Sequence, residues 1–168
     1  MTLSNFFYSS FTSLNSLLAL THSHNLSLTN LTFTNLSLPY QPLLSLTSLT
    51  NLSFSHLTAT HLSPASLTPT TFLHLSSVFG TLTHLTLTST TNLHLLTSSS
   101  SPLTLTHLSL HHNHSPYLLT LSDTSNLTQC TFTNNTGTLI NLEPQSQVTL
   151  HKCSIINNTG GLIHSLVN

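Results

Sequence analysis

Histidine is the side chain in this sequence best suited to chemistry, since 13 of the 168 residues are His. The histidines stand closest together at His111, His112 and His114, and again at His22 and His24. Residues two apart in a strand share a face, so such pairs could hold zinc or copper weakly. A closed metal site needs three or four ligands, which this spacing does not supply. We therefore interpret the histidines as outward polar residues, and we predict no metal site and no cofactor.

Charged side chains are rare: the acidic residues are Asp123 and Glu143, and Lys152 is the one Lys or Arg residue. They make up 2 % of the chain, against about a quarter of an ordinary soluble domain. Glycosidic chemistry needs an acid and a second carboxylate close together, whereas these two fall in different predicted turns. Neutralising nucleic-acid phosphates needs several Lys or Arg residues. We predict that the chain is not an enzyme and does not bind nucleic acid.

Two cysteines, Cys130 and Cys153, stand where similar segments of the chain carry leucine. Side chains that lie parallel and in register aim their sulfur atoms poorly for the dihedral angle of a disulfide. The sequence also lacks the spacing of cysteines that is typical of zinc sites. We interpret both residues as buried free thiols.

An internal repeat with the frame apolar-x-x-apolar-x-apolar organises the chain, as in Leu105-Thr-His-Leu108-Ser-Leu110. Alternation with a period of two predicts strands. Six such segments occur, each followed by a second apolar cluster, at a typical period of about 22 residues. This pattern predicts the coils of a solenoid, in which like positions stack. The predicted interior column consists of Leu31, Leu52, Leu85, Leu108, Cys130 and Cys153.

The repeat predicts a single domain over residues 1–168, with two irregular parts. Residues 1–25 form a poorly defined N-terminal segment in this interpretation, because the repeat is not recognisable there. The 33 residues from Leu52 to Leu85 predict an enlarged loop at 58–71. Neither end carries an evident cap, so we expect a fragment of a longer solenoid, or self-association through the coil ends.

Polar residues are expected in two kinds of column. Asn113, Asn135 and Asn158 follow the first strand of successive coils, where stacked amides can hydrogen-bond from coil to coil. We predict that these three form a structural ladder. Ser and Thr residues that alternate with the interior column should form an outward face. This candidate recognition face consists of Thr32, Thr34, Ser53, Ser55, Thr86, Thr88, Ser109, Thr131, Thr133 and Ser154.

Residues 126–166 resemble a known family. Cys130-Thr-Phe132-Thr-Asn134-Asn135-Thr-Gly137 and Cys153-Ser-Ile155-Ile-Asn157-Asn158-Thr-Gly160-Gly161-Leu162-Ile163 are similar to repeats of the right-handed parallel β-helix (pectin-lyase-like) superfamily. They look most like polymorphic outer-membrane-protein-like repeats, which combine Phe-x-x-Asn with Gly-Gly-Ala-Ile. The resemblance implies an all-β right-handed parallel β-helix, here of about six to seven coils with a period of about 22–23 residues. A leucine-rich-repeat solenoid is the alternative, because L-x-x-L-x-L-x-x-N fits residues 105–113.

Proteins that share this resemblance are mostly secreted or displayed on surfaces, and often serve adhesion. The resemblance therefore implies an extracellular or cell-surface location, although no signal peptide is recognisable and no apolar run is long enough to span a membrane. We predict a non-enzymatic solenoid whose Ser/Thr/Asn/His face recognises a glycan or a cell-surface protein. A structural segment without a ligand is the alternative. A lesser alternative is ice binding, because the Thr-x-Thr array resembles the ice-binding surface of some β-solenoid antifreeze proteins.

Overall fold

The computed structural model describes residues 2–9, 17–38, 41–65 and 68–165, and over 3–9 it defines the backbone alone. Regular structure in these residues is all β, and none of them forms a helix long and apolar enough to cross a membrane. The strands are β1 Thr2–Ser9, β2 Leu18–Thr34, β3 Ser37–Leu38, β4 Leu44–Thr60, β5 Ser63–Pro64, β6 Thr70–Thr88, β7 Leu93–Ser99, β8 Leu103–Thr106, β9 Ser109–His111, β10 His114–Leu121, β11 Thr124–Thr128, β12 Thr131–Thr133, β13 Thr136–Leu142, β14 Gln147–His151, β15 Ser154–Ile156 and β16 Ile163–Ser165.

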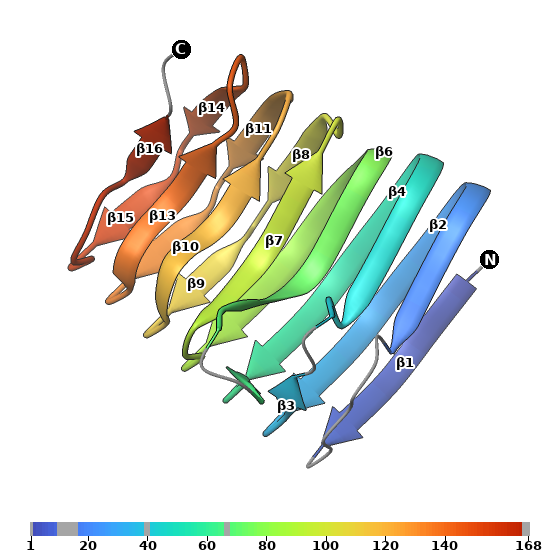
Figure 1. Ribbon diagram of the computed structural model, residues 1–168, viewed down its shortest axis with the longest axis horizontal. Coiled ribbons are helices and arrows are strands. Elements are labelled where there is room, and N and C mark those ends of the chain that lie inside the picture. Colours follow the sequence, from blue (N-terminus) through green and yellow to red (C-terminus); the bar gives the residue numbers. More distant parts are fainter. Residues whose placement is uncertain (1, 10–16, 39–40, 66–67, 166–168) are drawn as a thin grey trace.

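Each coil contributes three strand segments, and these stack on the neighbouring coils into three parallel ladders (Figure 1). Side A contains β8, β11 and β14, side B contains β9, β12 and β15, and side C contains β7, β10, β13 and β16. The longer strands β2, β4 and β6 each run through sides C, A and B in turn. The predicted parallel β-solenoid is therefore confirmed, with about six coils and a period near 23 residues.

Single residues with positive φ turn the chain from one side to the next. Corner 1, between sides A and B, and corner 2, between sides B and C, each use one such residue per coil, with φ between 52° and 55°. Asn and His tolerate this left-handed conformation better than most L-residues, and they fill most of these positions. Corner 1 consists of Asn30, His56, His84, His107, Gln129 and Lys152, and corner 2 of Asn35, His61, Ser89, His112, Asn134 and Asn157.

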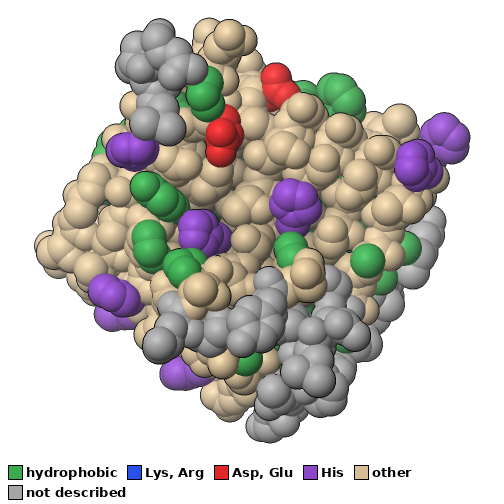
Figure 2. All heavy atoms as spheres, in the orientation of Figure 1, with side chains coloured by type: hydrophobic (Ala, Val, Ile, Leu, Met, Phe, Trp, Pro, Cys, Tyr) green, Lys and Arg blue, Asp and Glu red, His purple; other side chains and the backbone are tan. Residues whose placement is uncertain are grey.

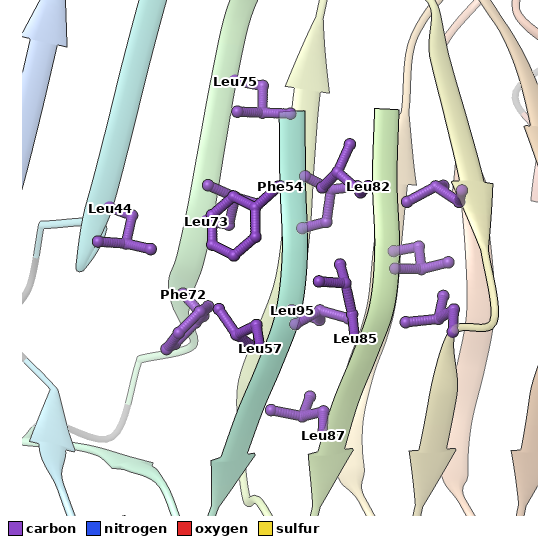
Figure 3. Close-up of a cluster of buried hydrophobic side chains, with 14 of the residues drawn as sticks. Leu44, Phe54, Leu57, Phe72, Leu73, Leu75, Leu82, Leu85, Leu87 and Leu95 are labelled. Carbon is purple, nitrogen blue, oxygen red and sulfur yellow. The ribbon is translucent and has the colours of Figure 1, made fainter. Parts of the chain in front are cut away.

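The interior of the solenoid is filled by leucine and phenylalanine side chains stacked in columns (Figure 3). Phe54, Phe72 and Leu82 have no exposed surface, and Phe33 packs edge-on against Phe72 at 5.2 Å between ring centroids. A buried large apolar side chain contributes about 1.5–3 kcal/mol. Strand alternation thus places most apolar side chains inward and most polar side chains outward, and the described residues form no ion pair.

The predicted interior column is wrong at one position. Leu31 pairs with Leu57, and Leu57 pairs with Leu85, so Leu57 rather than Leu52 occupies that column. Leu52 is buried, but it stacks on Leu26 in the part of the interior behind side A. The error arose because residues 49–54 repeat the apolar spacing of the true frame without crossing corner 1.

The corrected register also changes the two irregular parts. Residues 58–60 end β4 and residues 70–71 begin β6, so the predicted loop at 58–71 is shorter than expected, and its residues 66–67 lie outside the described residues. Within the predicted segment 1–25, β1 pairs with β2, and residues 18–25 pair regularly with β4. Residues 10–16 lie outside the described part of the chain.

Candidate recognition surface

Side B presents a polar surface built from rows of four outward side chains, one row per coil. Each row starts at corner 1, continues with two outward strand residues and ends at corner 2. We call these rows the side B surface. Its outward strand residues are the pairs Thr32/Thr34, Thr58/Thr60, Thr86/Thr88, Ser109/His111, Thr131/Thr133 and Ser154/Ile156.

The structure brings eight of the ten predicted recognition residues together on this surface. Ser53 and Ser55 are the exceptions, because they pair with Ser27 and Thr29 on side A. Their places on side B belong to Thr58 and Thr60, which the sequence prediction missed. The signal was present: Thr58-x-Thr60 follows His56 as Thr86-x-Thr88 follows His84. Recognising the corner residue would have fixed the register.

A column of stacked imidazole rings borders the side B surface at corner 1. The rings of His56 and His84 are parallel within 2°, with centroids 4.7 Å apart, and those of His84 and His107 lie 4.6 Å apart at 17°. These distances follow the spacing of about 4.8 Å between paired strands. His84 and His107 stand 23 residues apart in the sequence, which is one period of the repeat, and His56 extends their column to the preceding coil. We call these three residues the imidazole ladder.

Further histidines lie at the opposite edge of the side B surface. The Nε2 atom of His112 lies 3.1 Å from the Nδ2 amide nitrogen of Asn134, the next residue of corner 2. The side chain of His111 forms a hydrogen bond with the Ser109 hydroxyl in the same row. Polar side chains thus connect both along the solenoid axis and across it.

The predicted asparagine ladder is present inside corner 2. The Asn113 amide donates to the Asn135 side-chain oxygen at 3.0 Å, and the Asn135 amide donates to that of Asn158 at 2.9 Å. Each of these amides also donates to a backbone carbonyl of the preceding coil, at Leu87, Leu110 and Phe132 respectively. The ladder starts at Thr90, whose hydroxyl donates to Asn113 at 2.9 Å. These amides therefore serve the fold and are not part of the surface.

Comparison with known proteins identifies the architecture. A family model described as "Right handed beta helix region" matches residues 4–168. The chain belongs to the right-handed β-helix family. The match extends the resemblance seen in residues 126–166 to almost the whole sequence. No curated protein and no solved structure matches the chain significantly.

The two cysteines of this β-helix are free thiols, as predicted. Both continue the interior column below Leu108, and both donate weakly to backbone carbonyls, for example Cys130 to the Thr128 oxygen at 3.5 Å. Cys130 is buried, whereas Cys153 is half-buried in the last complete coil. Burial, and to a lesser degree the neighbouring Cys153, raise the pKa of Cys130 to about 12. Cys130 is therefore an unreactive interior thiol at neutral pH.

The two carboxylates of this β-helix lie at the edge between sides C and A, which does not border side B. Asp123 is the turn residue before β11, and Glu143 follows β13, where its N–H donates to the Leu121 oxygen at 3.0 Å. The two residues are exposed and occupy different turns of neighbouring coils. Figure 2, in which side C faces the reader, shows acidic side chains near this edge.

Other histidines lie apart on side C. The Nδ1 atom of His74 is 2.9 Å from the Thr97 hydroxyl oxygen, and His94 is half-buried beside Tyr117. Burial lowers the pKa of both imidazoles. Across the described residues, no group of three or more His, Cys, Asp or Glu side chains is arranged to hold a metal ion. The pairs at His22/His24 and His112/His114 thus gain no further ligand from neighbouring coils.

Proposed function

We propose that this β-helix is a non-enzymatic recognition module, displayed on a surface or secreted, whose side B surface binds a glycan. The observation that carries the proposal is the repeating row of two outward strand residues between two corner residues. Successive rows lie about 4.8 Å apart. Such a surface offers hydroxyl, amide and imidazole groups at regular intervals, which suits a ligand that is itself a repeating polymer with many hydroxyl groups.

Several features of the chain support recognition over catalysis. Asp123 and Glu143 are exposed, and they lie at the one edge that does not border side B. The reacting bond in glycoside hydrolysis must be flanked by a protonated acid and a carboxylate. The interior thiol of Cys130 is held in the protonated form at neutral pH, and so it is a poor nucleophile.

Binding to a glycan array tests the proposal, followed by titration of the glycans found. Replacing Thr58, Thr86 and Thr131 together by valine removes hydroxyls from side B but keeps β-branched side chains. We expect this triple variant to lose affinity by about tenfold or more, equivalent to about 1.4 kcal/mol.

The matched control replaces Thr81, Thr104 and Thr149 by valine, because these three occupy one outward column on side A. This control should bind as the wild type does. Equal losses in the two variants would remove the assignment to side B. Absence of binding to every glycan would favour the alternative of a purely structural segment.

Ice binding is the second candidate, and the corrected register favours it more than the sequence did. Thr-x-Thr pairs now occur at 32/34, 58/60, 86/88 and 131/133. The pairs at 32/34, 58/60 and 86/88 stack directly on one another in three consecutive coils. The array is interrupted at His111 and ends at Ile156. Thermal hysteresis of the purified protein, lost in the Thr58→Val/Thr86→Val/Thr131→Val variant, would support this candidate, and unaltered ice growth would remove it.

A further inference from the structure

We propose that the ligand of the side B surface is an anionic polysaccharide, bearing carboxylate or sulfate groups, and that protonation of the surface histidines switches binding on. This inference rests on the proposed recognition role of side B and gives its ligand a chemical class. Three observations carry it: the clustering of histidines around one side, the placement of both carboxylates elsewhere, and the close stacking of the imidazole ladder.

Positive charge can develop on side B more than on the rest of the molecule. Six of the 13 histidines belong to its rows, and so does the single lysine, Lys152. These histidines are His56, His84 and His107 at corner 1, His61 and His112 at corner 2, and His111 between them. Because Asp123 and Glu143 both lie at the opposite edge, no carboxylate side chain neutralises this surface.

The net charge of the chain depends on its histidines to an unusual degree. The formal charge is −1 when they are neutral and becomes +12 when all 13 are protonated. Histidine is the only side chain whose ordinary titration falls between about pH 5 and pH 8. The chain has no arginine, so at neutral pH it has almost nothing with which to attract a polyanion. Protonation of its histidines would make the same surface cationic.

The imidazole ladder couples binding of an anion to uptake of protons. Its ring centroids are 4.6–4.7 Å apart, well within the Debye length of about 8 Å at physiological salt, so protonated neighbours repel one another. An anionic group beside the column relieves this repulsion and favours the protonated state. Binding must then raise proton uptake, and lower pH must tighten binding, because the two equilibria are reciprocally linked.

The titratable groups around the ladder come from all three sides. On side A, His151 directly precedes Lys152 of corner 1, whereas His24 lies at the far end of its side A segment, next to the turn at His22; on side C, His114 follows corner 2. The half-buried His74 and His94 lie on side C, away from the ladder, and burial lowers the pKa of each.

The chemistry of the rows favours a polysaccharide over nucleic acid or a membrane. Hydroxyls of Ser and Thr lie between the two columns of corner residues, where they can bond to sugar hydroxyls. Binding of single-stranded nucleic acid uses aromatic side chains as stacking platforms, and membrane insertion uses large apolar ones. In the six rows from Thr32/Thr34 to Ser154/Ile156, the sole apolar side chain is Ile156, in the last row; before them, the β1 residue Phe7 pairs with Thr32.

Titration of the full chain with dextran sulfate and with neutral dextran, at about pH 5 and pH 7.5, tests the proposal. We expect dextran sulfate to bind at least about tenfold more tightly at the lower pH, with net proton uptake. The variant His56→Gln/His84→Gln/His107→Gln should lose most of this gain. Glutamine suits the position because Gln129 already occupies corner 1. The matched control, His22→Gln/His24→Gln/His164→Gln, removes three exposed histidines that lie outside side B and away from corner 1, and it should bind as the wild type does.

Each other outcome has a distinct meaning. Binding of a neutral glycan at pH 7.5 without any gain for dextran sulfate at pH 5 would overturn this inference and leave the proposed function intact. Failure of all glycans would overturn both. Equal losses in the two triple variants would show that net charge, and not side B, governs binding. Tighter binding to single-stranded DNA or to phosphatidylserine vesicles than to dextran sulfate would overturn the assignment to a polysaccharide.

Discussion

Replacement of Asn135 by alanine should destabilise the β-helix more than the same replacement of Asn158, the next residue of the asparagine ladder. The Asn135 side chain has no exposed surface and takes part in four hydrogen bonds. Its amide donates to the Leu110 oxygen at 2.8 Å and to Asn158 at 2.9 Å, and its oxygen accepts from the backbone and the side chain of Asn113, each at 3.0 Å.

The magnitude follows from these contacts. A buried hydrogen bond contributes about 0.5–1.5 kcal/mol net, and a buried group left without a partner costs about 1–3 kcal/mol. The variant would leave the Asn113 N–H and the Leu110 carbonyl without side-chain partners inside the protein. We therefore expect a loss of about 3–5 kcal/mol in the free energy of unfolding.

Urea unfolding followed by far-ultraviolet circular dichroism measures this loss, and Asn158→Ala is the matched control. Asn158 occupies the same ladder, but it is half-buried, so water can replace part of what its amide provides. The control should cost about 1 kcal/mol. A loss below about 1 kcal/mol for Asn135→Ala, or equal losses in the two variants, would refute the view that buried, mutually satisfied amides hold this corner.

Three further changes test other parts of the structure. Gly80→Ala should lower the free energy of unfolding by about 2–4 kcal/mol, because a Cβ atom there would lie 2.6 Å from both the Cβ and the carbonyl oxygen of Leu52. Gly161→Ala is the control, because the atom nearest to its added Cβ lies 3.5 Å away. Its free energy of unfolding should stay within about 0.5 kcal/mol of the wild type. Cys130 should resist maleimide labelling in the native state at about pH 8, because burial raises its pKa to about 12, and labelling as fast as in the urea-unfolded chain would contradict the burial. Stability should fall as the pH is lowered below about 6.5, since the lowered pKa values of folded His74 and His94 mean that the unfolded chain binds more protons in that range. The double variant His74→Gln/His94→Gln should show a shallower fall by thermal unfolding between about pH 4 and pH 7, and an unchanged slope would show that these two imidazoles do not govern it.

The repeat made most of this fold predictable from the sequence. Alternation placed Leu31, Leu85 and Leu108 in the interior, and the run of asparagines after each first strand indicated the amide ladder. The alignment failed at Leu52 because apolar spacing alone does not show which intervening residue turns the corner. Positive φ is a property of the folded coil, and at corner 1 the sequence marks it only by a single His, Asn, Gln or Lys.

The candidate surface was harder to predict than the fold for the same reason. The side B surface depends on which coil lies above which, so one misaligned coil moved two serines onto it and two threonines off it. The imidazole ladder depends on three consecutive coils, and the corrected register alone brings His56 beside His84. The single pair His84 and His107, which the period of 23 residues aligned correctly, was visible from the sequence.

At corner 2, which holds the asparagine ladder, the residue type at the interior position changes from one end of the solenoid to the other. In the coils of β2 and β4 its interior position is occupied by the buried Leu36 and Leu62, in the coil of β6 by Thr90, and in the three coils after that by asparagine. Near-identical coils could in principle pair one coil out of step. A slipped pairing would place an asparagine amide over a leucine side chain, where it has no acceptor. The residues at this corner therefore distinguish the earlier coils from the later ones, and they favour one register of pairing between coils.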